Sequence, residues 1–592
     1  MFAALFARPR ATTAVMVTNK ALAGCAVLVG CVALAGCGSG AGSEAGQVSA
    51  SGGAGSDPVG SMGGTVDGIG TVPTAGPDGL PVVPIEGRVS LRLLTKSEYR
   101  KSVEQLLGPI AAEPPIVDDS SVSGFYSVGA AQITVNEVAV ETYEAASLQL
   151  VQEVFGDPQR RLALVGCDPL PALTDECTAG YIRNFGRRAF RRPLSEVDVQ
   201  KWVGVAQAAA AVAADPVQAL QAVTSGLLQS PHFLYRTEIA LPDAMTGRVR
   251  FDGYSMASRL SFLLTGATPT DALLDLAATG QLDTPEGVRS AATGLLADPR
   301  TSDQLADFFL QLAGVELIEK KTKEVGAFPE FGPALAASML EETRLWIRDI
   351  VLAPNADVRG FFDSTQTVVD AQIASLYGLP PPAGGFAPVQ LAPESGRAGV
   401  FGKASFLAAH SAADSSSPTG RGHFIMEHFL CQTVPPPPPG IDTKLKEPPP
   451  GVKLTTRQRF EQHQAKPECA ACHSLMDPYG LALEHFDPIG RYRADEFGVP
   501  IDATGTINGV AFDGGAELGA ALREDKAALA CMVSNFHRYA NASAIVSDAR
   551  DKELLGALGL TFAAGGYAWR SWLIEFIASD AFRAAPPNPP LQ

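Results

Sequence analysis

The chain has 592 residues, of which 46% are hydrophobic and 18% are charged, and its formal net charge is −17 at pH 7. At roughly 150 residues per domain, this length predicts three or four units, with enough apolar residues for large cores. The acidic balance argues against nucleic acid as a partner, because a phosphate backbone requires a basic surface.

Residues 1–36 have the pattern of a bacterial export signal. Basic residues without any acidic residue precede an apolar run at 21–36, which is too short to span a bilayer comfortably. The run ends in Leu34-Ala35-Gly36-Cys37, which resembles a lipobox. We therefore expect an exported protein that is anchored to the cell envelope, at the outer membrane, by lipid on Cys37. The alternative is an ordinary signal peptide with a chance cysteine.

A flexible tether is expected to follow, because residues 37–85 are rich in Gly, Ser and Pro and lack periodicity. Regular structure is expected from about Val89. Thr95 lies three residues before Glu98, which is the spacing of a capping box at the start of a helix.

Most of the remaining chain shows helical periodicity, with short strand candidates only near 367–369 and 509–512. The predicted fold class is therefore mainly α. A proline-rich connector at 435–450 predicts extended chain, because proline interrupts helices. The expected divisions are N-terminal helical modules at 89–200, a central helical module at 201–380, a helical module at 381–434 and a small helical C-terminal module at 451–585.

Six short segments, taken in order, resemble a known family. They lie at 93–99, 185–194, 228–236, 257–264, 417–422 and 469–493. Together they resemble the consecutive domain-of-unknown-function modules of large secreted proteins from planctomycetes and myxobacteria. The resemblance implies export, association with cytochrome c-like modules and no established activity. Many relatives have an additional N-terminal cytochrome-like module, whereas this chain has only the tether there.

The sharpest chemical signal is a CxxCH motif formed by Cys469, Cys472 and His473. Two thiols at this spacing can add to the vinyl groups of a haem, and the adjoining histidine can ligate the iron. The motif predicts haem c, with both cysteines as thioether anchors and His473 as the proximal ligand. Two alternatives stay open: a Cys469–Cys472 disulfide, and a zinc site that includes His473.

A sixth iron ligand is expected from a different segment, because the attachment loop cannot reach the opposite face of the ring. Met532 is the metal-ligand candidate together with His473, and His537 and His485 are further candidates. Each of these three side chains can equally be a packed core residue. An iron with five ligands is also compatible with the sequence.

The other cysteines predict two disulfides. Cys167 and Cys177 are close in the chain and form a local pair in an oxidising compartment. If haem occupies the CxxCH thiols, Cys431 and Cys531 are left to pair with each other. Without haem, the last four cysteines allow three pairings, and the sequence does not choose between them.

The carboxylates Asp477, Glu484 and Asp487 suggest a glycosidase pair as a rival interpretation. We favour helix caps and partners for Arg491 and Arg493 instead, because each Asp precedes a proline, as at helix starts.

Three histidines, His410, His423 and His428, surround a helix that is predicted to begin at Ser417-Pro418. They suggest a metal site, but histidines that face solvent or cap a helix are commoner.

No Gly-x-Ser-x-Gly elbow, Walker loop, HExxH or dinucleotide fingerprint is present in the sequence, so whether the protein is an enzyme is left open. The leading hypothesis is a lipid-anchored c-type haem protein for electron transfer or redox sensing, with a redox partner. The alternative is a cell-surface binding or scaffold protein, engaging a surface polysaccharide, whose cysteines are structural and which holds no haem.

Overall fold

The computed structural model describes most of the chain from residue 91 onward. The described ranges are 91–169, 174–213, 215–242, 249–435, 448–465, 467–543 and 549–585. The predicted export signal, Cys37 and the predicted tether lie outside the described residues, as do residues 436–447 of the proline-rich connector. None of the helices within these ranges has the length and apolar character that a membrane span requires.

The described chain is mainly α-helical, as predicted, and its strands form only antiparallel two-stranded sheets. The two strand candidates correspond to β5 (Gln366–Val369) and β10 (Val510–Asp513). β5 pairs with β6 (Ala387–Gln390), and β10 pairs with β9 (Thr504–Ile507). The remaining pairs are β1 (Arg92–Leu93) with β2 (Tyr235–Arg236), β3 (Ala240–Pro242) with β4 (Val249–Phe251), and β7 (Asp495–Glu496) with β8 (Val499–Pro500).

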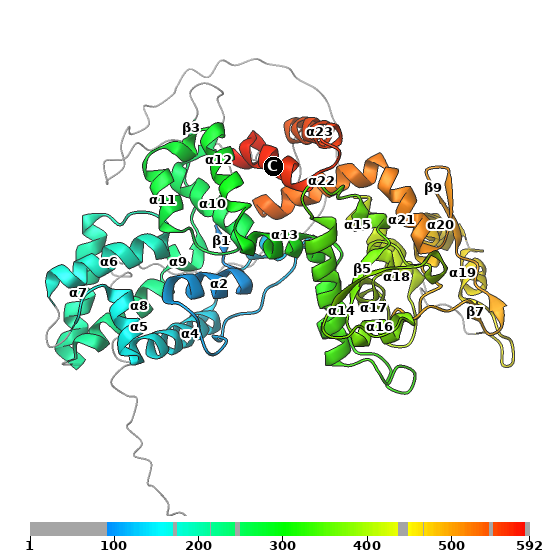
Figure 1. The fold of residues 1–592 in the computed structure, drawn as a ribbon, viewed down its shortest axis with the longest axis horizontal. Helices are drawn as coiled ribbons and strands as arrows, with labels where there is room; N and C mark the ends of the chain where they lie inside the picture. Colours follow the sequence, from blue (N-terminus) through cyan, green and yellow to red (C-terminus); the bar gives the residue numbers. More distant parts are fainter. Residues whose placement is uncertain are drawn as a thin grey trace, which may run out of the picture.

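An N-terminal lobe with its own core forms one end of the molecule (Figure 1). The predicted capping box opens its first helix: the Thr95 side chain accepts from the Glu98 N–H, and the Glu98 carboxylate accepts from the Thr95 N–H. The lobe contains β1, β2, α2 (Lys96–Leu107), α4 (Glu137–Gly156), α5 (Pro158–Val165), α6 (Asp175–Phe190), α7 (Glu196–Ala213), α8 (Pro216–Gln229) and α9 (Pro231–Leu234).

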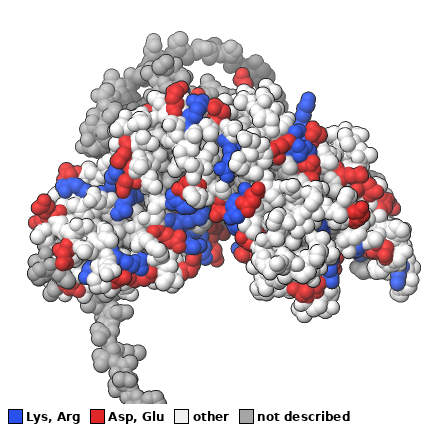
Figure 2. Space-filling model, in the orientation of Figure 1, with Lys and Arg blue, Asp and Glu red and all other residues white. Residues whose placement is uncertain are grey.

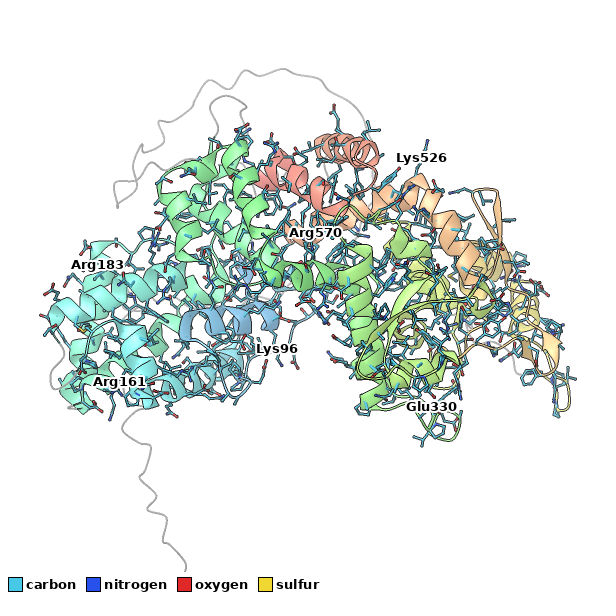
Figure 3. The ribbon with its side chains drawn as sticks, viewed as in Figure 1. Lys96, Arg161, Arg183, Glu330, Lys526 and Arg570 are labelled. Atoms are coloured by element: carbon cyan, nitrogen blue, oxygen red, sulfur yellow. A yellow bond between two sulfur atoms is a disulfide. The ribbon has the colours of Figure 1, made fainter. Side chains whose placement is uncertain are left out.

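A central block joins segments from the middle and the end of the chain (Figure 1). It contains α3 (Tyr126–Ala130), α10 (Gly253–Thr265), α11 (Asp271–Ala278), η1 (Gln281–Asp283), α12 (Pro285–Leu295), α13 (Pro299–Leu312), α22 (Lys526–Asn541), α23 (Ala549–Ala564), α24 (Trp569–Ala578) and α25 (Asp580–Arg583). Arg570, labelled in Figure 3, donates to the Ser302 hydroxyl at 2.7 Å and to the Leu352 carbonyl at 3.1 Å. The last helices are thus fixed to the middle of the chain.

The second lobe carries the CxxCH motif. It contains η2 (Val315–Lys320), α14 (Pro333–Trp346), η3 (Ile347–Val351), α15 (Gly360–Asp363), α16 (Ala371–Tyr377), η4 (Pro393–Ser395), η5 (Val400–Gly402), α17 (Ala404–Ala409), α18 (Pro418–Phe424), η6 (Ile425–Phe429), α19 (Thr456–Gln464), α20 (Pro467–Leu481), α21 (Gly514–Glu524) and sheets β5–β6, β7–β8 and β9–β10. Residues on both sides of the proline-rich connector, such as Phe429 and Met476, belong to one continuous core.

The surface of the face shown in Figure 2 carries Lys and Arg interspersed with Asp and Glu, and a recess separates the two lobes along one edge. Oppositely charged side chains pair locally, as in Arg183 with Glu196 at 2.8 Å. Such exposed pairs contribute little to stability, about 0–1 kcal/mol each.

Candidate functional site

Helix α20 (Pro467–Leu481) holds the whole CxxCH motif. Cys469 and Cys472 are one helical turn apart and therefore lie on the same side of the helix. Cys469 is buried, whereas Cys472 is partly exposed, and both are free thiols. The motif thus presents two neighbouring thiols on a rigid element.

Helices α20 and α18 are in close contact at two glycines, one from each helix. A Cβ atom at Gly480 would lie 1.8 Å from the Pro418 carbonyl oxygen, and one at Gly422 would lie 2.0 Å from the Met476 carbonyl oxygen. Only glycine allows such an approach, so the two backbones touch directly at this crossing. The position of the motif relative to the second lobe is therefore fixed.

The six described cysteines divide into two disulfides and the two thiols of the motif. Cys167 is bonded to Cys177 with a Cα–Cα distance of 6.1 Å, and Cys431 to Cys531 with a distance of 5.4 Å. The first pairing is the local one that the sequence predicted, and the second is the one expected if the thiols of the motif are reserved for haem. Cys469 and Cys472 do not form the disulfide that one alternative expected.

His473 is oriented by a buried carboxylate one turn further along α20. Its Nδ1 lies 2.9 Å from Oδ2 of Asp477, which is wholly buried. The carboxylate also accepts from Gln464 Nε2 at 2.8 Å and from the Thr419 hydroxyl at 3.1 Å. With the proton on Nδ1, the lone pair of His473 is on Nε2, the arrangement that metal-ligating histidines commonly have.

Asp477 differs from the helix cap that the sequence predicted. Asp477 and Pro478 lie inside α20, and the carboxylate turns to His473 instead of to backbone N–H groups. Burial raises the pKa of Asp477, while the hydrogen bonds from Gln464 and His473 lower it. Asp477 is therefore a hydrogen-bond partner of the His473 imidazole and does not cap the start of a helix.

Helix α19 supplies two rings beside His473. The ring centroid of His463 lies 4.9 Å from that of His473, and the centroid of Phe460 lies 6.3 Å away. Among the described residues, no group of three or more His, Cys, Asp and Glu side chains is arranged to hold a metal ion. The zinc alternative therefore has no ligand set in this part of the chain.

The candidates for a sixth ligand have packing roles or backbone partners. Met532 and His537 lie in α22 and are 2% and 6% exposed, and Figure 1 places α22 in the central block, away from α20. His485 Nδ1 lies 3.1 Å from the Arg493 carbonyl oxygen. Met532 lies in α22 and His473 in α20, and whether Met532 is the sixth ligand stays a prediction.

The carboxylates that follow the motif are engaged by arginines, as the ion-pair interpretation predicted. Arg493 donates to Glu484 at 2.7 Å, and Arg491 donates to Asp487 at 2.9 Å. The Ser416 hydroxyl donates to Glu484 at 2.9 Å. Both carboxylates are thus ion-paired, as expected of partners for Arg491 and Arg493.

A second candidate region is a cavity of about 520 Å³ that the sequence analysis did not anticipate. His410 and His428 line it, and the Phe424 ring contacts both at centroid distances of 3.9 and 4.0 Å. His423, the third histidine of the suggested metal site, instead lies 3.5 Å from Glu427. The sequence singled out these histidines as a candidate site. It did not predict that residues near 121–126 and 311–321 line the same cavity, because only the fold brings these segments together.

Four family models match the chain, each described as a protein of unknown function. In chain order they are PSD3 (DUF1587) at 92–156, PSD5 (DUF1595) at 177–238, PSD4 (DUF1592) at 251–379 and PSCyt3 (DUF1588) at 397–496. The PSCyt3 match contains the CxxCH motif. No curated protein and no solved structure matches the chain.

Proposed function

Since the chain belongs to the planctomycete-type family that is built of these consecutive modules, we propose that its CxxCH motif binds haem covalently for electron transfer or redox sensing. The name of the PSCyt3 model suggests a cytochrome-like module. One observation carries the proposal: four described cysteines pair, while Cys469 and Cys472 stay as neighbouring thiols beside a histidine with Nε2 available.

The donor set of α20 fits a covalently held haem. Each thiol would form one C–S bond with a vinyl carbon while its hydrogen moves to the neighbouring vinyl carbon, so no oxidant is consumed. His473 would ligate through Nε2, and Asp477 would hold Nδ1–H. A bound haem would supply one-electron exchange at its iron.

The supporting residues of the site act through Asp477. Gln464 and Thr419 occupy carboxylate lone pairs and restrain its rotation, and the carboxylate in turn orients the imidazole. A charged acceptor on Nδ1 makes Nε2 a stronger donor, which favours the oxidised iron. Asp477 is thus a positioning residue for the proposed ligand.

An Asp477→Asn variant tests this role. Asparagine retains the size of the side chain but removes the charge, so we expect the reduction potential of the haem-loaded protein to rise by on the order of 50–100 mV. Spectroelectrochemical titration measures the potential. A Thr456→Ser variant, at the far end of α19, is expected to leave it unchanged. An unaltered potential in Asp477→Asn would contradict the positioning role.

Peptide mass spectrometry tests the attachment itself. The full chain would be coexpressed with a c-type haem maturation system, and the peptide containing Cys469 and Cys472 would be examined after extraction of non-covalent haem. We expect that peptide to retain the mass of haem. A Cys469–Cys472 disulfide or two alkylatable thiols would reject the proposal and favour the surface-binding alternative with structural cysteines.

We further propose that the protein is exported and held at the cell envelope by lipid on Cys37, where it would meet a redox partner. The support is the signal-like pattern of residues 1–36, and the two disulfides are typical of an oxidising compartment. Replacing Cys37 by Ser is expected to move the protein from the membrane fraction to the soluble fraction after cell lysis. Continued sedimentation of this variant with membranes would count against the anchor.

A further inference from the structure

The cavity of about 520 Å³ is built from three segments that are distant in the sequence. They are residues 121–126, 311–321 and 409–428, and each comes from a different matched module: PSD3, PSD4 and PSCyt3. A volume of this size is in the range of pockets that bind small organic molecules. The chemistry of the lining residues therefore decides which molecules the cavity can bind.

The rings of the aromatic wall pack closely on one another. Phe424 contacts both His410 and His428, and His410 also packs on Phe406 at a centroid distance of 4.6 Å. Gly124 lies close to His428, since a Cβ atom there would be 2.7 Å from Cε1 of the imidazole.

The imidazole of His428 is an unused hydrogen-bonding group. Neither ring nitrogen makes a hydrogen bond with any residue that the structure describes, whereas His410 Nε2 lies 2.8 Å from the Ala313 carbonyl oxygen. Burial lowers the pKa of His428 to about 4, so the ring is neutral at pH 7, with one N–H donor. A polar group that faces a cavity can be satisfied there by a ligand or by water.

Lys321 is the basic residue of the lining, and Glu316 is its acidic residue. The Lys321 ammonium has no ion-pair partner among the described residues. Burial, together with the charges of Asp307, Asp119 and Glu319, raises the pKa of Glu316 to about 8 against the opposing effect of Arg344. Burial thus disfavours a negative charge on Glu316, and Lys321 is the cationic side chain of the lining.

We propose that this cavity binds a small organic carboxylate. Lys321 would pair with the carboxylate, and the His428 N–H, which lines the same space, would be a further donor. Because three modules form the walls, a bound acid would hold them together and stabilise the folded chain. The proposal does not depend on haem binding.

Calorimetric titration of the full chain tests the proposal with benzoate, succinate and glucuronate, each compared with its neutral amide. We expect at least one acid to bind and its amide to bind about tenfold more weakly or not at all. Lys321→Met should weaken binding of the acid by about tenfold, because it removes the partly buried charge. Lys320→Met, which removes an exposed neighbouring lysine, is the matched control and should leave affinity unchanged.

A Glu316→Gln variant tests whether the Glu316 carboxyl is protonated when the acid binds. Gln is neutral and nearly isosteric, so affinity for the acid should change by less than about threefold. The unfolding temperature of each variant without ligand checks that it is folded. Failure of all three acids to bind, equal affinity for acids and amides, or equal losses in Lys320→Met and Lys321→Met would overturn the proposal.

Discussion

Removing the Cys431–Cys531 disulfide should destabilise the protein by about 4–5 kcal/mol in the chain-entropy model. The bond closes a loop across a sequence separation of 100 residues and joins the end of η6 to α22. Its loss frees a long segment of the unfolded chain, which contains the proline-rich connector and the CxxCH helix. The test is a Cys431→Ser/Cys531→Ser double variant, in which neither thiol remains to mispair with the motif.

The short disulfide provides the matched control. Cys167 and Cys177 are separated by only 10 residues, so their double Ser variant should lose about 2 kcal/mol less than the long-loop variant. Denaturant unfolding, followed by circular dichroism, measures both losses. Equal losses, or a larger loss for the short loop, would contradict the assigned role of the long disulfide.

Replacing Gly480 by Ala should cost about 3 kcal/mol or more. The new Cβ would lie 1.8 Å from the carbonyl oxygen of Pro418, and this backbone atom can move only if α18 and α20 separate. Because α20 carries the CxxCH motif and Asp477, the separation should also lower the yield of haem attachment. Thermal unfolding of the chain measures the first effect.

Gly556→Ala is the control for this substitution. Gly556 is exposed within α23, and a Cβ atom there meets nothing within 4 Å. Ala has the higher helix propensity, so this variant should be more stable by about 0.5–1 kcal/mol. If Gly480→Ala were as stable as Gly556→Ala, the close helix crossing described for α18 and α20 would be wrong.

Local signals in the sequence predicted local structure well. The predicted Thr95–Glu98 capping box is present. Its two hydrogen bonds join residues only three positions apart, so they depend on local sequence and not on distant contacts. The Cys431–Cys531 pairing was also predicted, although the residues are distant, because assigning the CxxCH thiols to haem leaves these two cysteines without other described partners. Periodicity likewise predicted the mainly α fold.

Contacts between distant segments could not be predicted from the sequence. The Asp477-Pro478 pair is typical of a helix start, but packing of α20 on α18 and α19 keeps the proline inside the helix and brings Gln464 and Thr419 to the carboxylate. The cavity is a stronger case, because Tyr126 and Lys321 meet His428 only after three modules assemble. No spacing in the sequence predicts that these three residues lie together.

Haem content decides most directly whether the CxxCH motif binds haem covalently. The protein and its Cys469→Ser/Cys472→Ser variant would be produced together with a c-type haem maturation system, purified and assayed as pyridine haemochromes. The account predicts about one covalent haem per wild-type chain, with the spectrum of two thioether bonds, and none in the variant. A correctly folded wild-type chain without covalent haem, or equal haem in both proteins, would contradict it.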